Sequence, residues 1–174
     1  QPTVLRSYGV RRMGQPAQVD ENTLFAIGST TKAFTSATLA TLVDEGKLTW
    51  DTRVSDVLPG FKLQDAYASS EMTVRDLLVH RSGLGLGAGD LLFYPPPSDR
   101  TRAEIVHSLR YIKPASSFRS TFAYSNMMYL VAGEVIKAVG GASWEEAVRQ
   151  RIFAPLQMTS STTSSLLPAG ANRA

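Results

Sequence analysis

The chain has 174 residues, of which 43% are hydrophobic and 19% charged, so it can form an ordinary globular core. The formal net charge is +3, and the lysines and arginines are scattered, which argues against nucleic-acid binding. Cysteine is absent, so disulfides, thiolate catalysis and cysteine-ligated metals are excluded. The histidines, His80 and His107, lie far apart in the sequence without a matching acidic cluster, so no metal site is expected.

Two β-strands are expected at the N-terminus. Residues 3–12 alternate between apolar and polar side chains, a turn follows at 14–16, and residues 24–28 form a short apolar run. Together they predict a β-hairpin within residues 1–28. Because two strands do not form a stable sheet alone, we expect the remaining strands of an antiparallel sheet to follow residue 174, or the chain to pair with another chain.

Residues 29–158 are predicted to be mainly helical. A short helical turn is expected at 54–58, and apolar spacing with capping signals indicates longer helices at 30–46, 73–79, 101–112, 126–139 and 143–154. Residues 159–174 are expected to form a loop or a frayed end. The sequence has neither a membrane-spanning apolar stretch nor a recognisable signal peptide. Its abrupt start at Gln1 suggests that it begins within a longer protein.

A lysine stands in the first turn of the helix predicted at 30–46. Ser29 is suited to cap this helix, but a capping box needs Glu or Gln three residues later, where the sequence has Lys32. The positive end of the helix dipole disfavours such a cation by roughly 0.3–1 kcal/mol. A lysine one turn from a serine hydroxyl can act as the base for a nucleophile, in the pattern S-x-x-K. The alternative is a capping serine with a solvated lysine, since the pattern also occurs by chance.

Tyr124 and Asn126 lie where a strand-like run meets the helix predicted at 126–139. In the simplest interpretation, Asn126 caps the helix and Tyr124 packs beneath it. In the functional interpretation, a cation close to Tyr124 makes its phenolate easier to form. Tyr124 would then be a second proton carrier next to Ser29.

These motifs together resemble the serine beta-lactamase-related family, in the branch of class C beta-lactamases, D-Ala-D-Ala carboxypeptidases and esterases. They are S-x-x-K at 29–32, L-L-x-H-x-S-G-L at 77–84 and Y-x-N at 124–126, in the family's order and at about its spacing. The resemblance covers nearly the whole chain. It implies an α+β, beta-lactamase/transpeptidase-like fold, of which residues 1–174 form a partial domain: a sheet hairpin, a central helix with a helical lobe, and the tail.

The resemblance also implies a role for each of four residues. Ser29 would attack a carbonyl carbon and form an acyl-enzyme, with its own backbone N–H as one oxyanion donor. Lys32 and Tyr124 would share the proton transfers, and which of them is the base stays open. Asn126 would hold Lys32 and the substrate amide. No cofactor is implied, the substrate would be a small molecule or a peptide, and the family suggests a periplasmic or secreted location.

The sequence departs from the family pattern in two places. The third motif, Lys or His followed by any residue and Gly on a strand, is absent, and with it the second oxyanion donor. Residues 81–83 match its letters but belong to the H-x-S-G-L turn. Residues 118–121 replace the Pro-Gly turn of many relatives, which we expect to affect local shape more than chemistry. Because part of the active site is missing, the chain alone is expected to have little or no activity.

Other features of the sequence favour structural roles. A Ser-His-Asp triad with His80 is disfavoured, because the resemblance implies a structural histidine at a helix end, where a cation suits the helix dipole. His107 is expected at the surface or in packing. The glycine-rich segment 83–89 lacks the pattern of a phosphate-binding loop. Together with residues 91–97, it is expected to form a long loop that shapes the acyl pocket.

Three functions are compatible with these residues. The first is a serine hydrolase that acts through an acyl-enzyme on an amide, beta-lactam or ester carbonyl. The second is a penicillin-binding or sensing module that is acylated but turns over slowly. The third is a non-catalytic scaffold of the same fold, or an inactive fragment of the enzyme. The sequence does not separate the first two, because the same residues serve both.

Overall fold

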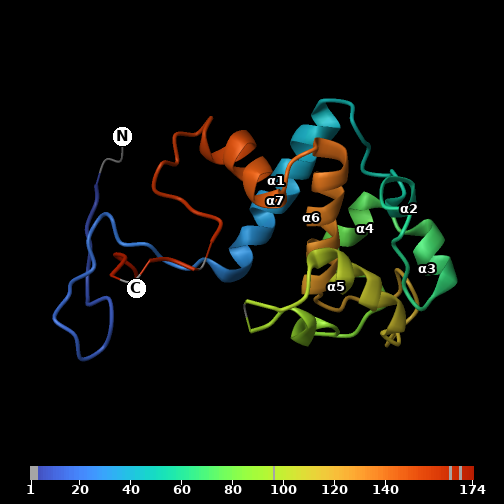
Figure 1. Ribbon diagram of the computed structural model, residues 1–174, viewed down its shortest axis with the longest axis horizontal. Coiled ribbons are helices and arrows are strands. Elements are labelled where there is room, and N and C mark those ends of the chain that lie inside the picture. The colour runs from blue at the N-terminus through green and yellow to red at the C-terminus, as the bar shows by residue number, and fades with distance from the viewer. Residues whose placement is uncertain (1–3, 96, 165, 169) are drawn as a thin grey trace.

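Helix α6 (Asn126–Gly140) lies in the middle of the helical part of the molecule (Figure 1). The structure is a computed structural model that describes residues 4–95, 97–164, 166–168 and 170–174. The completely buried apolar side chains of α6 are Met127, Met128, Val131, Ala132, Val135 and Ile136. Because they cover more than one face of the helix, α6 packs against several neighbours: α1 (Thr31–Asp44), α4 (Val74–Leu78), α5 (Arg102–Ser108) and α7 (Trp144–Val148).

The other helical segments of the described chain surround α6. The first of them in the chain are a 3-10 turn, η1 (Gly28–Thr30), and helix α1 (Thr31–Asp44), which follows it directly. The remainder are α2 (Val54–Val57), α3 (Ala66–Glu71), α4 (Val74–Leu78), η2 (Asp90–Leu92), α5 (Arg102–Ser108), η3 (Leu109–Tyr111), α7 (Trp144–Val148) and the π-helical turn η4 (Arg149–Phe153). They confirm the predicted helices to within a few residues, except that η3 and η4 take over the last turns of two of them.

Helix α3 is the one α-helix of the described residues that the sequence pattern does not predict. Its start is stabilised by Asp65, whose side chain accepts hydrogen bonds from the backbone N–H groups of Tyr67 and Ala68. Within α3, only Ala68 is buried. The helix therefore lacks the apolar periodicity by which a helix is recognised in a sequence.

The predicted N-terminal β-hairpin, and with it the α+β fold class for residues 1–28, is wrong. The described residues contain no β-strand, and the first predicted strand is reduced to an isolated antiparallel bridge between Val10 and Gln18. Leu24, in the second, forms an isolated parallel bridge with Arg173. Short extended segments need further strands or a packed face to become a sheet. Here Phe25 and Ile27 remain 60% and 49% exposed, so no packed face is available.

The C-terminal segment returns to the N-terminal segment and is tied to it by Asn172. The Asn172 side chain donates a hydrogen bond to Asp20 at 2.8 Å and accepts one each from Arg11 and Thr23 at 3.0 Å. The bond from Asn172 is the main cause that lowers the pKa of Asp20. Figure 1 shows the C-terminal end beside the N-terminal segment, away from the helices around α6. Residues 1–3, 96, 165 and 169 lie outside the described chain, including the start of the first predicted strand.

An ion pair with a buried carboxylate and a partly exposed guanidinium anchors the loop that leads into α6. Asp76, in the first turn of α4, is 6% exposed and forms a capping box with Thr73. Arg119 donates to its carboxylate from Nε at 2.9 Å and from a terminal nitrogen at 2.6 Å. Burial raises the pKa of Asp76, but the bonds from Arg119 and Thr73 outweigh it and hold the pKa below its ordinary value.

Arg119 also explains how the chain turns without the Pro-Gly pair. Its φ is 62°, in the left-handed region that glycine adopts most easily. Its side chain lies over the ring of Phe118, with 4.6 Å between the guanidinium carbon and the ring centre. The ion pair with Asp76 thus holds a backbone conformation that an arginine would otherwise rarely adopt.

We predict that Arg119→Met lowers the free energy of unfolding by about 2 kcal/mol, because Asp76 stays buried without its cation while Arg119 itself is partly exposed. Denaturant unfolding measures this loss. Since the pKa of Asp76 is depressed, the contribution is complete above about pH 4 and is lost as the pH falls through that lowered pKa.

Arg75→Met is the matched control. Arg75 pairs with Asp51 at the surface, where the two side chains are 55% and 77% exposed, so its loss should cost less than about 0.5 kcal/mol. Equal losses in both variants would contradict a special role for the Arg119–Asp76 pair.

Candidate active site

Ser29 lies at an exposed corner where the chain enters α1, in the middle of η1. Gly28 before it has a φ of 53°, a conformation that glycine adopts readily in a sharp turn. The Ser29 hydroxyl does not cap the helix, because the cap residue of α1 is Thr30. Instead, Ser29 Oγ accepts hydrogen bonds from Lys32 Nζ at 3.2 Å and from the Tyr124 hydroxyl at 2.7 Å. The interpretation of Ser29 as a simple cap is therefore wrong.

Lys32 is held at the start of α1 by groups from α6 and the loop before it. Its Nζ donates to Asn126 Oδ1 at 2.7 Å. It also lies 4.6 Å from the ring centre of Tyr124 and 5.2 Å from that of Tyr129. A charge-assisted hydrogen bond and the two ring faces favour a cation and offset the cost of the helix dipole. The lysine is thus neither misplaced nor simply solvated.

Asn126 is the first residue of α6, but it does not cap that helix. Ser125 is the cap residue, and its hydroxyl accepts from the backbone N–H of Met128. The Asn126 side chain is therefore free to face α1, where Oδ1 accepts from Lys32. Its nitrogen, Nδ2, donates to Asp90 Oδ2 at 3.0 Å. The fold thus brings together all four predicted site residues, Ser29, Lys32, Tyr124 and Asn126.

The electrostatics of the cluster favour proton transfer by Tyr124. The interaction with Lys32, followed by the hydrogen bond with Ser29, lowers the pKa of Tyr124, while burial and the Asp90 carboxylate oppose this shift. A lowered pKa makes the phenolate more accessible near neutral pH. Tyr124 is therefore suited to accept a proton from the serine hydroxyl that it touches.

His80 supports Tyr124 rather than Ser29. Its ring stacks on that of Tyr124 with 4.6 Å between the centres, and its Nδ1 accepts a hydrogen bond from the backbone N–H of Ser125 at 3.1 Å. Burial and then the charge of Lys32 lower the pKa of His80. The expectation of a cationic histidine is therefore wrong, because a protonated Nδ1 could not accept this bond.

Two residues of the site, Tyr129 and Asp90, lie outside the sequence motifs, whereas His80 belongs to the motif at 77–84, which does not indicate its contact with Tyr124. Tyr129 is one turn into α6, His80 reaches the site only through stacking, and Asp90 follows the glycine-rich segment, which predicts a loop but singles out no side chain. The local signal for Tyr129 is its position three residues after Asn126 on α6, which makes the two residues neighbours on the helix surface. His107, by contrast, is exposed on α5, as expected.

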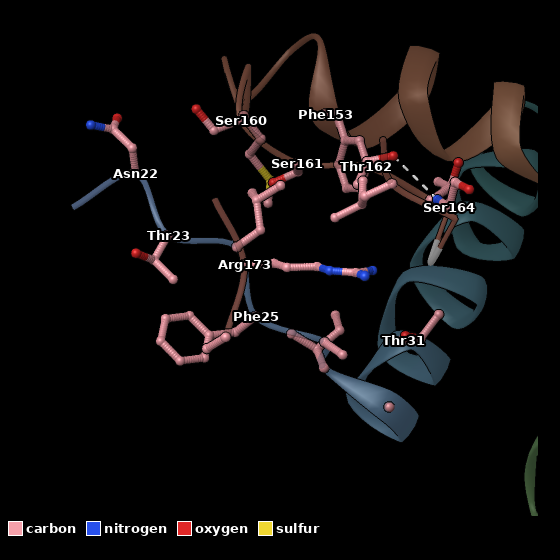
Figure 2. A pocket seen from close by; sticks show the side chains of 18 of the residues that line it. Asn22, Thr23, Phe25, Thr31, Phe153, Ser160, Ser161, Thr162, Ser164 and Arg173 are labelled. Carbon is pink, nitrogen blue, oxygen red and sulfur yellow. Dashed lines mark hydrogen bonds between the residues drawn. The ribbon is translucent and has the colours of Figure 1, made fainter. Parts of the chain in front are cut away.

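A groove of about 740 Å³ lies beside this cluster but does not contain it (Figure 2). It runs between residues 21–28, the start of α1 and the C-terminal segment, with Phe25, Phe153 and the serines and threonines of 160–164 along its walls. The four predicted site residues are not part of its lining. Among the described residues, no group of three or more acidic or histidine side chains could hold a metal ion, and no helix could cross a membrane.

Lys32→Met should raise the pKa of Tyr124 toward its ordinary value of 10.0, because the variant loses the interaction that lowers it most. Tyrosine ring carbons labelled with ¹³C report this titration by NMR. Lys47→Met is the control, because Lys47 pairs with Glu45 at the other end of α1. An unchanged Tyr124 titration in Lys32→Met would show that the two side chains do not interact.

His80→Asn should reduce the loss of stability on acidification. The folded protein holds His80 with a lowered pKa, so its contribution is complete above pH 6.5 and is lost as the pH falls through the lowered value. Asparagine can still accept the bond from Ser125 and tolerates the φ of 57° found at this position. Unfolding free energies measured between pH 7 and pH 5 should therefore fall less in the variant. A parallel fall in both proteins would contradict a lowered pKa of His80 in the folded protein.

Several known proteins are similar to this chain over most of its length. Penicillin-binding protein 4 of Amycolatopsis lactamdurans is 34% identical over 155 residues, covering 89% of this chain and 40% of the relative. An unguisins hydrolase of Aspergillus campestris is 34% identical over 171 residues, covering 93% and 31%. The crystal structure of D-amino acid amidase from Ochrobactrum anthropi matches with a TM-score of 0.70 and 32% identity, covering 86% and 41%.

The chain thus spans between 31% and 41% of the length of these relatives. The family model described as Beta-lactamase matches residues 1–174, which is the whole chain. The chain belongs to the beta-lactamase family.

Proposed function

We propose that this protein is a serine hydrolase that acts through an acyl-enzyme on an amide, beta-lactam or ester carbonyl. The observation that supports this most directly is the pair of hydrogen bonds on Ser29 Oγ, from Tyr124 and from Lys32. A serine hydroxyl with two proton carriers in contact is the arrangement of an activated nucleophile. Relatives named as a hydrolase and an amidase support the same reaction class.

In the proposed reaction, Ser29 Oγ attacks the carbonyl carbon and forms a new C–O bond. Its proton passes to the Tyr124 oxygen, 2.7 Å away, when Tyr124 is a phenolate, or to the Lys32 nitrogen, 3.2 Å away, when Lys32 is a neutral amine. The bond from the carbonyl carbon to the leaving nitrogen or oxygen then breaks, and the leaving group takes up that proton. Water attacks the acyl-enzyme in the second half, releasing the acid and restoring the Ser29 hydroxyl.

Substrate binding uses the groups around this nucleophile. The backbone N–H of Ser29 lies in the first turn of a helix, where N–H groups lack helical partners, and would donate to the developing oxyanion. Asn126 has two N–H donors on Nδ2, and one faces Asp90. The other can bind a substrate carbonyl. Asn126 therefore both holds Lys32 and contacts the substrate in this proposal.

We predict that benzylpenicillin or a fluorophosphonate adds its acyl or phosphonyl mass to Ser29, as located by peptide mass spectrometry. Ser29→Ala should abolish the adduct, and Ser36→Ala, one turn beyond Lys32 on α1, should leave it intact. Tyr124→Phe should slow acylation by roughly 10²- to 10⁴-fold, because it loses one proton carrier.

The full-length protein and the 174-residue chain should be compared, since we expect the shorter one to react weakly without the third motif. No adduct on Ser29 of the full-length protein would refute the proposal. A stable adduct without turnover of penicillins or nitrophenyl esters would favour the penicillin-binding module, the kind of protein that the Amycolatopsis relative is named for.

A further inference from the structure

Asp90 lies directly behind the Asn126 side chain, on the side opposite to Lys32. Asp90 Oδ2 accepts a hydrogen bond from Asn126 Nδ2 at 3.0 Å, and Asn126 Oδ1 accepts from Lys32 Nζ at 2.7 Å. We propose that Asp90 is a positioning residue: it fixes the Asn126 amide with its oxygen toward Lys32 and thereby sets the rate of acylation at Ser29. The rate effect rests on the proposed function, whereas the orientation of the amide does not.

The donor and acceptor inventory requires this orientation. An ammonium group can only donate hydrogen bonds, and an ionised carboxylate can only accept them. Asn126 stands between one of each, so only one orientation of its amide satisfies both Lys32 and Asp90. Turning the amide over would place its N–H donors against the Lys32 ammonium and its oxygen against the Asp90 carboxylate. Each of these contacts would be repulsive.

Asp90 becomes essential when Lys32 gives up its proton. A neutral amine carries a lone pair and can accept a hydrogen bond, so Lys32 then no longer determines which end of the Asn126 amide faces it. The Asp90 carboxylate still accepts only from Nδ2. Asp90 therefore holds Asn126 in one orientation through both protonation states of Lys32, and the cluster keeps its geometry while protons move.

The backbone around Asp90 is built to bring it to this place. Gly89 has a φ of 89°, and a Cβ there would lie 2.8 Å from Met127 Cγ and 3.0 Å from Ile112 Cδ1. The turn therefore rests directly on Met127, the residue after Asn126, at a distance that only glycine permits. The Asp90 N–H donates to the carbonyl oxygen of Gly87 at 3.0 Å, which closes the turn.

The second carboxylate oxygen points to the same conclusion. Asp90 Oδ1 is buried and has no hydrogen-bond partner within the described part of the chain. A buried acceptor without a donor costs stability, so this carboxylate is not explained by stability alone. Orienting the Asn126 amide is a role that accounts for the Asp90 carboxylate.

The test uses Asp90→Asn and Asp90→Ala in the full-length protein, with Asp99→Asn as a control for an exposed aspartate of the same loop. The first readout is the side-chain NH₂ signal of Asn126 by ¹⁵N NMR, assigned through Asn126→Ala. In the unsubstituted protein we expect one proton of this group to be shifted downfield and protected from exchange at every pH. Asp90→Ala should lose that signature, Asp90→Asn should weaken it because its amide can present either its oxygen or its nitrogen to Asn126, and Asp99→Asn should keep it.

The second readout is the rate constant for acylation by nitrocefin as a function of pH. Asp90→Asn should lower it by roughly 10- to 100-fold. The shape of the pH profile should also change, because the variant no longer fixes the Asn126 amide in both protonation states of Lys32, and Asp99→Asn should follow the unsubstituted protein. A purely structural role would instead lower the free energy of unfolding and leave the shape of the pH profile unchanged.

Two results would overturn the proposal: an Asn126 signal that does not depend on Asp90, or an acylation profile of Asp90→Asn that matches Asp99→Asn. If the unsubstituted protein is not acylated at Ser29, the proposed function fails. The NMR readout then still decides whether Asp90 orients Asn126, so the two failures are distinguishable.

Discussion

The hydrogen bond between Lys32 and Asn126 joins the first turns of the two long helices, α1 and α6. Lys32 lies at the positive end of the α1 dipole, which disfavours a cation, and Asn126 is not needed as the cap of α6. Each residue provides the hydrogen-bond partner of the other, because Lys32 Nζ donates to Asn126 Oδ1 at 2.7 Å. The packing of α1 against α6 sets their separation, so the core of the molecule determines the geometry of the site.

A second layer of contacts holds Tyr124 against Ser29. The segment that leads into α6 is bonded to the chain after α4: the N–H of Ala123 donates to the carbonyl oxygen of His80, and that of Arg119 to Arg81, both at 2.8 Å. The His80 ring then stacks on Tyr124. The ion pair between Arg119 and Asp76 attaches the same segment to α4. The candidate nucleophile Ser29, on an exposed corner, is thus supported through Tyr124 by a network of partly buried contacts.

Local patterns predicted the motif residues of the site but not their environment. The S-x-x-K and Y-x-N patterns are short, so Ser29, Lys32, Tyr124 and Asn126 can be found without knowledge of the fold. Asp90 has no such pattern, because its role depends on a contact with a residue 36 positions away. The capping interpretations of Ser29 and Asn126 failed for a related reason. Thr30 and Ser125 occupy those cap positions, which left both side chains free for contacts between helices.

The sequence by itself determined the helices of the described chain other than α3 and the short turn η2, the family and the chemical identity of the candidate nucleophile, because these follow from short-range spacing and residue type. The strands predicted within residues 1–28 were wrong. A sheet forms only with partner strands, and a local sequence pattern does not show whether such partners are present. Only the tertiary structure decided how the Lys32 cation is tolerated and why the pKa of His80 is lowered. It also placed a carboxylate behind Asn126. Each of these depends on the distance between groups far apart in the chain, and electrostatic and hydrogen-bond energies are set by that distance.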